Sequence, residues 1–173
     1  MEKDPSKMTP KELKAAIQAE VDTRTTPQQY FVIARAYHVS ARSLMNNPIP
    51  RLGHWDAPVR SLFHHAAELY LKAFLLRSGM TPAQLRSGAG HDYEKLVEDA
   101  QDRGLVLASQ FADTLRALQQ LGAFSRARYQ FVGIQREIEL EDLNNLCNAL
   151  APLVGPHALG AIPPARMDVI EPI

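Results

Sequence analysis

Apolar residues recur at intervals of three and four along most of the chain, the spacing that places them on one face of an α-helix. This pattern predicts helices over about residues 10–21, 27–46, 57–78, 91–104, 107–121 and 140–154. No alternating strand pattern recurs, although the short segment FVGI is compatible with an extended backbone. We therefore expect an all-α protein built as an antiparallel helical bundle of about five to six helices.

Three of the predicted helix starts share one local motif, which reads TPKE, TPQQ and TPAQ and begins at Thr9, Thr26 and Thr81. In each, the threonine can cap the helix, the proline suits the first helical position, and the Glu or Gln can return a hydrogen bond to the cap. Gly79 and Gly104 follow the periodic segments at their other ends and predict helix termination there.

The chain divides into an N-terminal arm with a short helix (1–26), a helical bundle (27–154) and a Pro-rich tail (155–173). The arm helix carries Leu13, Ile17 and Val21 on one side. The helix over 27–46 is expected to turn one apolar face inward, made of Tyr30, Ile33, Ala34, Tyr37, Ala41, Leu44 and Met45. In the helix over 57–78, we expect Leu71 and Phe74 to pack between the second and the last helix.

The composition narrows the possible functions. The 19 basic and 19 acidic residues among 173 give a net charge of zero, which argues against a protein whose whole surface binds nucleic acid. Cys147 is the single cysteine and cannot form an internal disulfide, which favours a cytoplasmic protein. The N-terminal residues are not those of a secretory signal, and no apolar run reaches the length of a membrane span.

The stretch FHHAAELYLKAFL is almost wholly apolar, yet ionisable residues form one line along its helix. These are Arg60, His64, His65, Glu68 and Lys72. Two interpretations remain open. The line can face solvent as a series of pairs four residues apart, or it can line a groove or a dimer contact. In the second interpretation, Glu68 would orient His64 or raise its basicity.

The segments AAELYLKAFLLRSGM and GHDYEKLVEDA resemble the HEPN family (higher eukaryotes and prokaryotes nucleotide-binding domain). The matching residues are Ala66, Glu68, Lys72, Gly90, His91, Asp92 and Leu96. The later RARYQ, which contains Arg128, is similar to an Arg-Tyr element of some members. The resemblance covers about residues 27–154 and implies an all-helical bundle of the HEPN type.

The resemblance also implies two activities. Many HEPN members are metal-independent ribonucleases that carry an Arg and, four to six residues later, a His near a late helix, with two protomers pairing these motifs across a homodimer. Others lack the motif and bind RNA or nucleotides, often beside a nucleotidyltransferase in toxin–antitoxin or defence systems. Here no histidine follows Arg126, Arg128 or Arg136 at that spacing. The spacing does occur from Arg60 to His65.

A second match to that spacing runs from Arg86 to His91, in a Gly-rich connection where His91 can instead cap the next helix. No residue is firmly assigned to catalysis. Arg60 and His65 are the candidates, should the protein be a ribonuclease. A basic stripe is predicted on the second helix, formed by Arg35, His38 and Arg42. It can contact phosphates, face solvent, or pair across a dimer with the acidic segment 92–102.

The candidate ligand-binding residues combine the line, the stripe and the family motifs: Arg35, His38, Arg42, Arg60, His64, His65, Glu68, Lys72, His91 and Arg128. His64 and Glu68 have the spacing of two metal ligands, but nothing fixes a third, so neither a metal nor a cofactor is expected.

We predict an atypical, non-catalytic HEPN protein, a homodimer, that binds RNA, a nucleotide or a protein partner. A metal-independent endoribonuclease and a purely structural interaction module are the alternatives.

Overall fold

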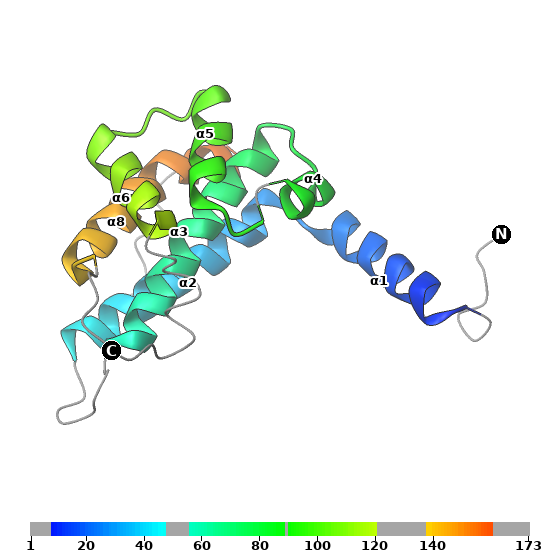
Figure 1. Ribbon diagram of the computed structural model, residues 1–173, viewed down its shortest axis with the longest axis horizontal. Helices are drawn as coiled ribbons and strands as arrows, with labels where there is room; N and C mark the ends of the chain where they lie inside the picture. Colours follow the sequence, from blue (N-terminus) through cyan, green and yellow to red (C-terminus); the bar gives the residue numbers. More distant parts are fainter. Residues whose placement is uncertain (1–7, 48–55, 89, 121–137, 161–173) are drawn as a thin grey trace.

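The computed structural model describes residues 8–47, 56–88, 90–120 and 138–160, and the regular elements within these ranges are all α-helices (Figure 1). They are α1 (Pro10–Arg24), α2 (Pro27–Asn46), α3 (Ala57–Arg77), α4 (Pro82–Ser87), α5 (Tyr93–Asp102), α6 (Ser109–Gln120) and α8 (Leu140–Leu159). The predicted all-α class is thus confirmed. The FVGI segment lies outside the described residues.

The local signals in the sequence set the helix ends. Thr9, Thr26 and Thr81 each cap a helix in a complete capping box, as predicted. Gly79 and Gly104 follow α3 and α5 with φ of 94° and 93°. A side chain at such a φ is strained, so glycine is the residue that lets each helix end in a tight turn.

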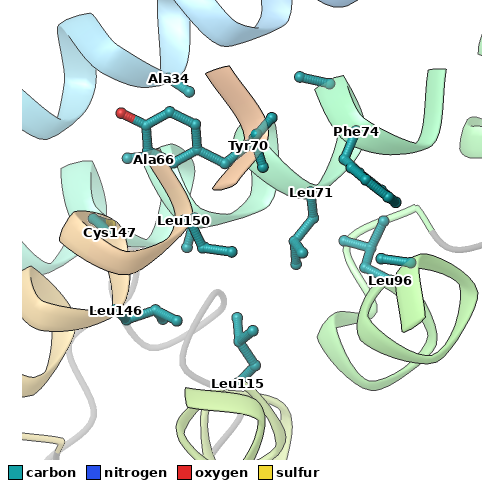
Figure 2. Packing of buried hydrophobic residues seen from close by; sticks show 14 of the residues in the cluster. Ala34, Ala66, Tyr70, Leu71, Phe74, Leu96, Leu115, Leu146, Cys147 and Leu150 are labelled. Carbon is teal, nitrogen blue, oxygen red and sulfur yellow. The ribbon is translucent and has the colours of Figure 1, made fainter. Parts of the chain in front are cut away.

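Helix α3 forms the centre of the molecule and packs against α2, α5 and α8. Its side chains Leu71 and Phe74 are 0 and 4 % exposed, and the Phe74 ring meets His157 of α8 with the ring centroids 5.5 Å apart. Figure 2 shows side chains from α3, α5, α6 and α8 converging on this core, Leu96 and Leu115 among them. The wide apolar surface of α3 is therefore covered within one chain and does not itself require a second copy.

The buried face of α2 differs from the predicted one. Phe31, Ala34, His38 and Ala41 are buried, whereas Ile33 is 48 % exposed and Leu44, also predicted to face inward, is 38 % exposed. The helix is turned so that the large Phe31 ring packs against Tyr70 of α3, with the centroids 5.5 Å apart. The packing of this aromatic ring against α3, rather than the number of apolar residues on each face, therefore sets the orientation of α2.

Helix α8 continues beyond the predicted boundary at residue 154, through Gly155 and Pro156 to Leu159. A methyl group on Gly155 would come within 3.1 Å of the Phe31 ring, so glycine lets α8 approach α2 closely. The tight contact holds the last turn of α8 against the core, although Pro152 and Pro156 each remove a helical N–H donor.

Helix α1 extends away from the other helices (Figure 1) and buries none of its residues. Its apolar side chains Leu13, Ile17 and Val21 share one side, as predicted, and are 39, 54 and 49 % exposed. A bidentate ion pair between Asp22 and Arg86 connects α1 to α4. None of the described helices combines the length and apolar character that crossing a bilayer requires.

Candidate functional site

The line of ionisable residues on α3 is covered by protein rather than exposed. His64 and Glu68 are each 4 % exposed, so the interpretation as a solvent-facing ladder is wrong at these two positions. The start of α5 covers them. The Tyr93 hydroxyl donates to the His64 carbonyl at 3.0 Å, and the His91 ring lies against Glu68.

Glu68 is the centre of a small charged group that we call the Glu68 cluster, made of Glu68, Lys72 and His91. The Lys72 ammonium donates to Glu68 Oε1 at 2.6 Å. His91 Nδ1 lies 2.9 Å from Oε1 and 3.0 Å from Oε2 of the same carboxylate. The side chains of Glu68, Lys72 and His91 are 5, 12 and 58 % exposed, so the cluster runs from the core to the surface.

The connection between α4 and α5 brings His91 to Glu68. Gly90 adopts a φ of 49°, and its N–H donates to the Leu85 carbonyl at 2.8 Å, which turns the chain back toward α3. Asp92 then caps α5 by accepting from Lys95 N at 3.0 Å. The alternative in which His91 caps this helix is wrong, because Asp92 fills that role and leaves the imidazole to reach Glu68.

The contact with Glu68 assigns the tautomer of His91. A carboxylate only accepts hydrogen bonds, so Nδ1 must carry the proton that it shares with Glu68. Nε2, on the opposite side of the ring, is then an acceptor in neutral imidazole and a donor in the protonated form. A buried carboxylate thus holds a largely exposed imidazole in one orientation and one tautomer, an arrangement suited to ligand binding or proton transfer.

Tyr30 lies close enough to Glu68, and to the Asp22–Arg86 ion pair, for their charges to act on its hydroxyl. Burial raises the pKa of Tyr30, and the charges of Glu68 and Asp22 raise it further, whereas Arg86 opposes the shift. Arg86 Nη2 donates to Asp22 Oδ2 at 2.6 Å, and this pairing lowers the pKa of Asp22. Tyr30 was not predicted as a site residue, because its proximity to Glu68 depends on a contact between helices that are distant in sequence.

His64 has a different environment from His91. Its Nδ1 is buried and has no hydrogen-bond partner among the described residues. Burial lowers its pKa to about 4, and the charges of Arg60 and His65 act in the same direction. The prediction that Glu68 orients His64 or raises its basicity is therefore wrong, since Glu68 binds His91 and His64 is held neutral.

The candidate catalytic residues Arg60 and His65 are engaged in structural contacts. Arg60 Nε donates to Asp56 Oδ2 at 2.7 Å, and its guanidinium also donates to the Ile138 carbonyl just before α8. His65 Nδ1 lies 2.9 Å from the Ser61 carbonyl, and its ring packs against Tyr37 of α2 with the centroids 5.3 Å apart. The contacts with Ile138 and Tyr37 link α3 to the segment before α8 and to α2.

The predicted basic stripe on α2 does not include His38 at the surface. His38 is buried, with Nδ1 3.5 Å from the Tyr70 hydroxyl. Burial lowers its pKa, an effect that Asn144 opposes and that the charges of Arg42 and Arg35 reinforce. The imidazole is thus favoured as a neutral core group. Arg42 is exposed and Arg35 is partly exposed, so these two arginines alone supply basic charge at the surface of α2.

Among the described residues, no group of three or more His, Cys, Asp or Glu side chains could hold a metal ion. Cys147 is buried, and burial raises the pKa of its thiol, which suits a core residue rather than a nucleophile. Arg128 lies outside the described residues. Comparison of the chain with family models, with curated proteins and with solved structures gives no match.

Proposed function

We propose that the chain is an atypical, non-catalytic HEPN-like protein that binds RNA or a nucleotide, and that a phosphate of the ligand binds at the Glu68 cluster. The observation that carries the proposal is the orientation of His91. Its ring is fixed by Glu68 through Nδ1, and more than half of its side chain is exposed. A protonated imidazole held in this way presents an N–H donor and a positive charge, which phosphate oxygens accept.

The charges of the cluster favour an anion once His91 is protonated. Glu68 and Lys72 cancel each other in their ion pair, so protonation of His91 adds one positive charge at the surface end of the cluster. A phosphate that binds there in turn favours the protonated imidazole, because each charge stabilises the other.

Binding is favoured over cleavage for a chemical reason. Hydrolysis of an RNA strand needs one group to remove a proton and another to supply one. His91 can perform one of these tasks, but Glu68 and Lys72 are tied to each other in the protein interior. The Tyr30 hydroxyl, with a raised pKa, is poorly suited to releasing a proton near neutral pH.

A metal-independent endoribonuclease is the second candidate, and one specific observation supports it. The Glu68 carboxylate holds His91 in the tautomer in which Nε2 can act as a base, and Arg86 precedes His91 at the spacing of the ribonuclease motif. Incubation of labelled RNA with the protein in EDTA tests it. Cleavage that His91→Ala or His65→Ala abolishes would establish the enzyme and overturn the non-catalytic proposal.

The binding proposal is tested by titrating the chain with a short single-stranded RNA and with ATP at two salt concentrations. His91→Gln should weaken binding of both ligands, whereas His157→Gln, at an exposed histidine of α8, should not. A double change of Arg35 and Arg42 to Ala should weaken RNA binding and flatten its salt dependence, because fewer counterions are released.

If neither ligand binds the unaltered chain at near-millimolar protein, the proposal fails. Recognition of a protein partner, such as a nucleotidyltransferase of a toxin–antitoxin or defence system, would then be the leading function. A structural module would be favoured if Arg35 and Arg42 proved to be buried between two copies of a homodimer.

A further inference from the structure

A groove of about 460 Å³ lies between α6 and α8, a volume within the range of small-molecule sites. Its lining consists of Gln110, Phe111, Thr114, Asp142, Asn145, Asn148 and Ala149. The first three residues come from α6 and the others from α8, so helix packing places polar groups from two distant segments around one space. None of these residues belongs to the Glu68 cluster.

The lining has a distinctive chemistry. Three carboxamides, one hydroxyl and one carboxylate share the groove, and its lining contains neither lysine nor arginine among the residues that the structure describes. A phosphate would meet the Asp142 carboxylate without a compensating cation from these residues, so an anionic group is disfavoured. Carboxamides donate and accept in one plane and can form paired hydrogen bonds with the edge of a planar ligand that also does both.

An aromatic ring in the lining favours a flat ligand. Phe111 is only partly buried and packs against the core while it lines the groove, so its ring can offer a surface for stacking.

We infer that this groove binds a nucleobase, and that it selects bases with an exocyclic amino group. Adenine, cytosine and guanine carry such a group and can donate it to Asp142, whereas uracil presents carbonyl oxygens in its place. The inference rests on the proposed function only for the choice of a base over a sugar, because both are polar ligands that can pack on an aromatic ring. The base can belong to an RNA strand or to a free nucleotide.

Helix α6 links the groove to the start of α5, which follows His91. Gln119, near the end of α6, accepts from the backbone N–H of Tyr93, which is two residues after His91. Thr114 of the groove precedes Gln119 by five residues, a distance of about 7.5 Å along the helix axis. A strand of a few nucleotides is longer than this separation along the helix axis.

The test uses the full chain and ligands that lack phosphate. Adenosine, cytidine, guanosine and uridine are titrated separately while the amide resonances of the protein are followed by NMR. The three amino-bearing nucleosides should shift α6 and α8 resonances and bind roughly tenfold more tightly than uridine. Asp142→Asn should remove most of this preference. Glu141→Gln is the matched control, since Glu141 is also exposed in the first turn of α8 but does not line the groove.

Three results would overturn the inference: no nucleoside binding at millimolar concentrations, uridine binding as well as the others, or binding of simple sugars in place of nucleosides. Titrations with adenine and uracil pentanucleotides beside AMP and UMP distinguish RNA from a free nucleotide as the source of the base. If nucleosides still bind the His91→Gln variant, and AMP binds the unaltered chain no more tightly than adenosine, the groove is supported and the proposed phosphate site fails. If AMP binds through its phosphate but no nucleoside binds, the phosphate site is retained and the groove is rejected.

Discussion

Helices α1 and α3 reverse the usual relation between residue type and exposure. Helix α3 buries ionisable side chains, with His64 and Glu68 each 4 % exposed, whereas α1 leaves its apolar stripe in solvent, with Ile17 54 % exposed. Both helices have a periodic sequence. The N-terminus of α1 is the better capped of the two, because Thr9 forms a complete capping box whereas Asp56 makes no side-chain cap hydrogen bond to α3. Local signals therefore determine that a helix forms, and the neighbouring elements determine which of its side chains are buried.

The two helices also differ in how their side chains contribute to stability. Burial of a charged group in α3 is tolerated where partners compensate it, as Lys72 and His91 do for Glu68. No group in the described part of the chain compensates His64 at Nδ1, and burial holds its ring neutral instead. The exposed side chains of α1 gain little from packing, so the Asp22–Arg86 ion pair is its main described link to the rest of the chain.

The largest expected contrast between the two helices comes from removing an apolar side chain. Phe74→Ala in α3 should lower the free energy of unfolding by about 3–5 kcal/mol, because the ring is buried and its loss leaves a cavity. Ile17→Ala in α1 should change it by less than about 0.5 kcal/mol, since that side chain is half exposed. Urea unfolding of both variants measures the contrast. A loss under about 1 kcal/mol for Phe74→Ala would contradict the assigned packing of α3.

Removal of a lysine should give the next largest contrast. Lys72→Met deprives the buried Glu68 of its closest partner and should cost about 3 kcal/mol in unfolding free energy. Lys14→Met, at an exposed position of α1, should have an effect within about 0.5 kcal/mol. Chemical denaturation at pH 7 compares the two. Equal stability of the two variants would show that Glu68 does not depend on Lys72.

Acid should destabilise the protein through His64. The folded-state pKa of about 4 lies below the unfolded value near 6.5, so the unfolded chain takes up a proton first as the pH falls. Stability should decrease by about 2 kcal/mol between pH 7 and pH 5. His38, whose pKa is also lowered by burial, acts in the same direction.

Replacement of His64 by Leu should remove most of the His64 part of this pH dependence, whereas His157→Gln should leave it unchanged. Urea unfolding across this pH range, with both variants beside the unaltered chain, measures the effect. A pH profile that His64→Leu does not alter would show that His64 is accessible to protons in the folded state.

The sequence predicted the features that depend on adjacent residues. The three Thr-Pro caps and the helix ends at Gly79 and Gly104 are confirmed, as is the burial of Leu71 and Phe74. The orientation of α2 and the end of α8 were not predicted. The first depends on the packing of Phe31 against Tyr70 and the second on the close approach of Gly155 to Phe31, and helical periodicity contains no information on contacts between separate helices.

The sequence predicted the residues of the candidate site but not the contacts between them. Glu68, Lys72 and His91 were all selected, and the pairing of Glu68 with Lys72 follows from their spacing of four residues. The pairing of Glu68 with His91 spans 23 residues and depends on the turn at Gly90. One signal pointed toward it. Glu68 is the only acid of α3, and a lone acid on an apolar helix needs a cation or a donor from another element.

The central claim is that Glu68 fixes His91 at its Nδ1 and that a phosphate binds to the exposed imidazole. Long-range proton–nitrogen NMR of the histidine side chains, recorded with and without ATP, tests this claim most directly. We predict that neutral His91 carries its proton on Nδ1, and that ATP shifts the His91 Nε2 signal while the buried His64 signals stay in place. A proton on Nε2 in neutral His91, or an ATP titration that leaves the His91 signals unmoved, would contradict the account.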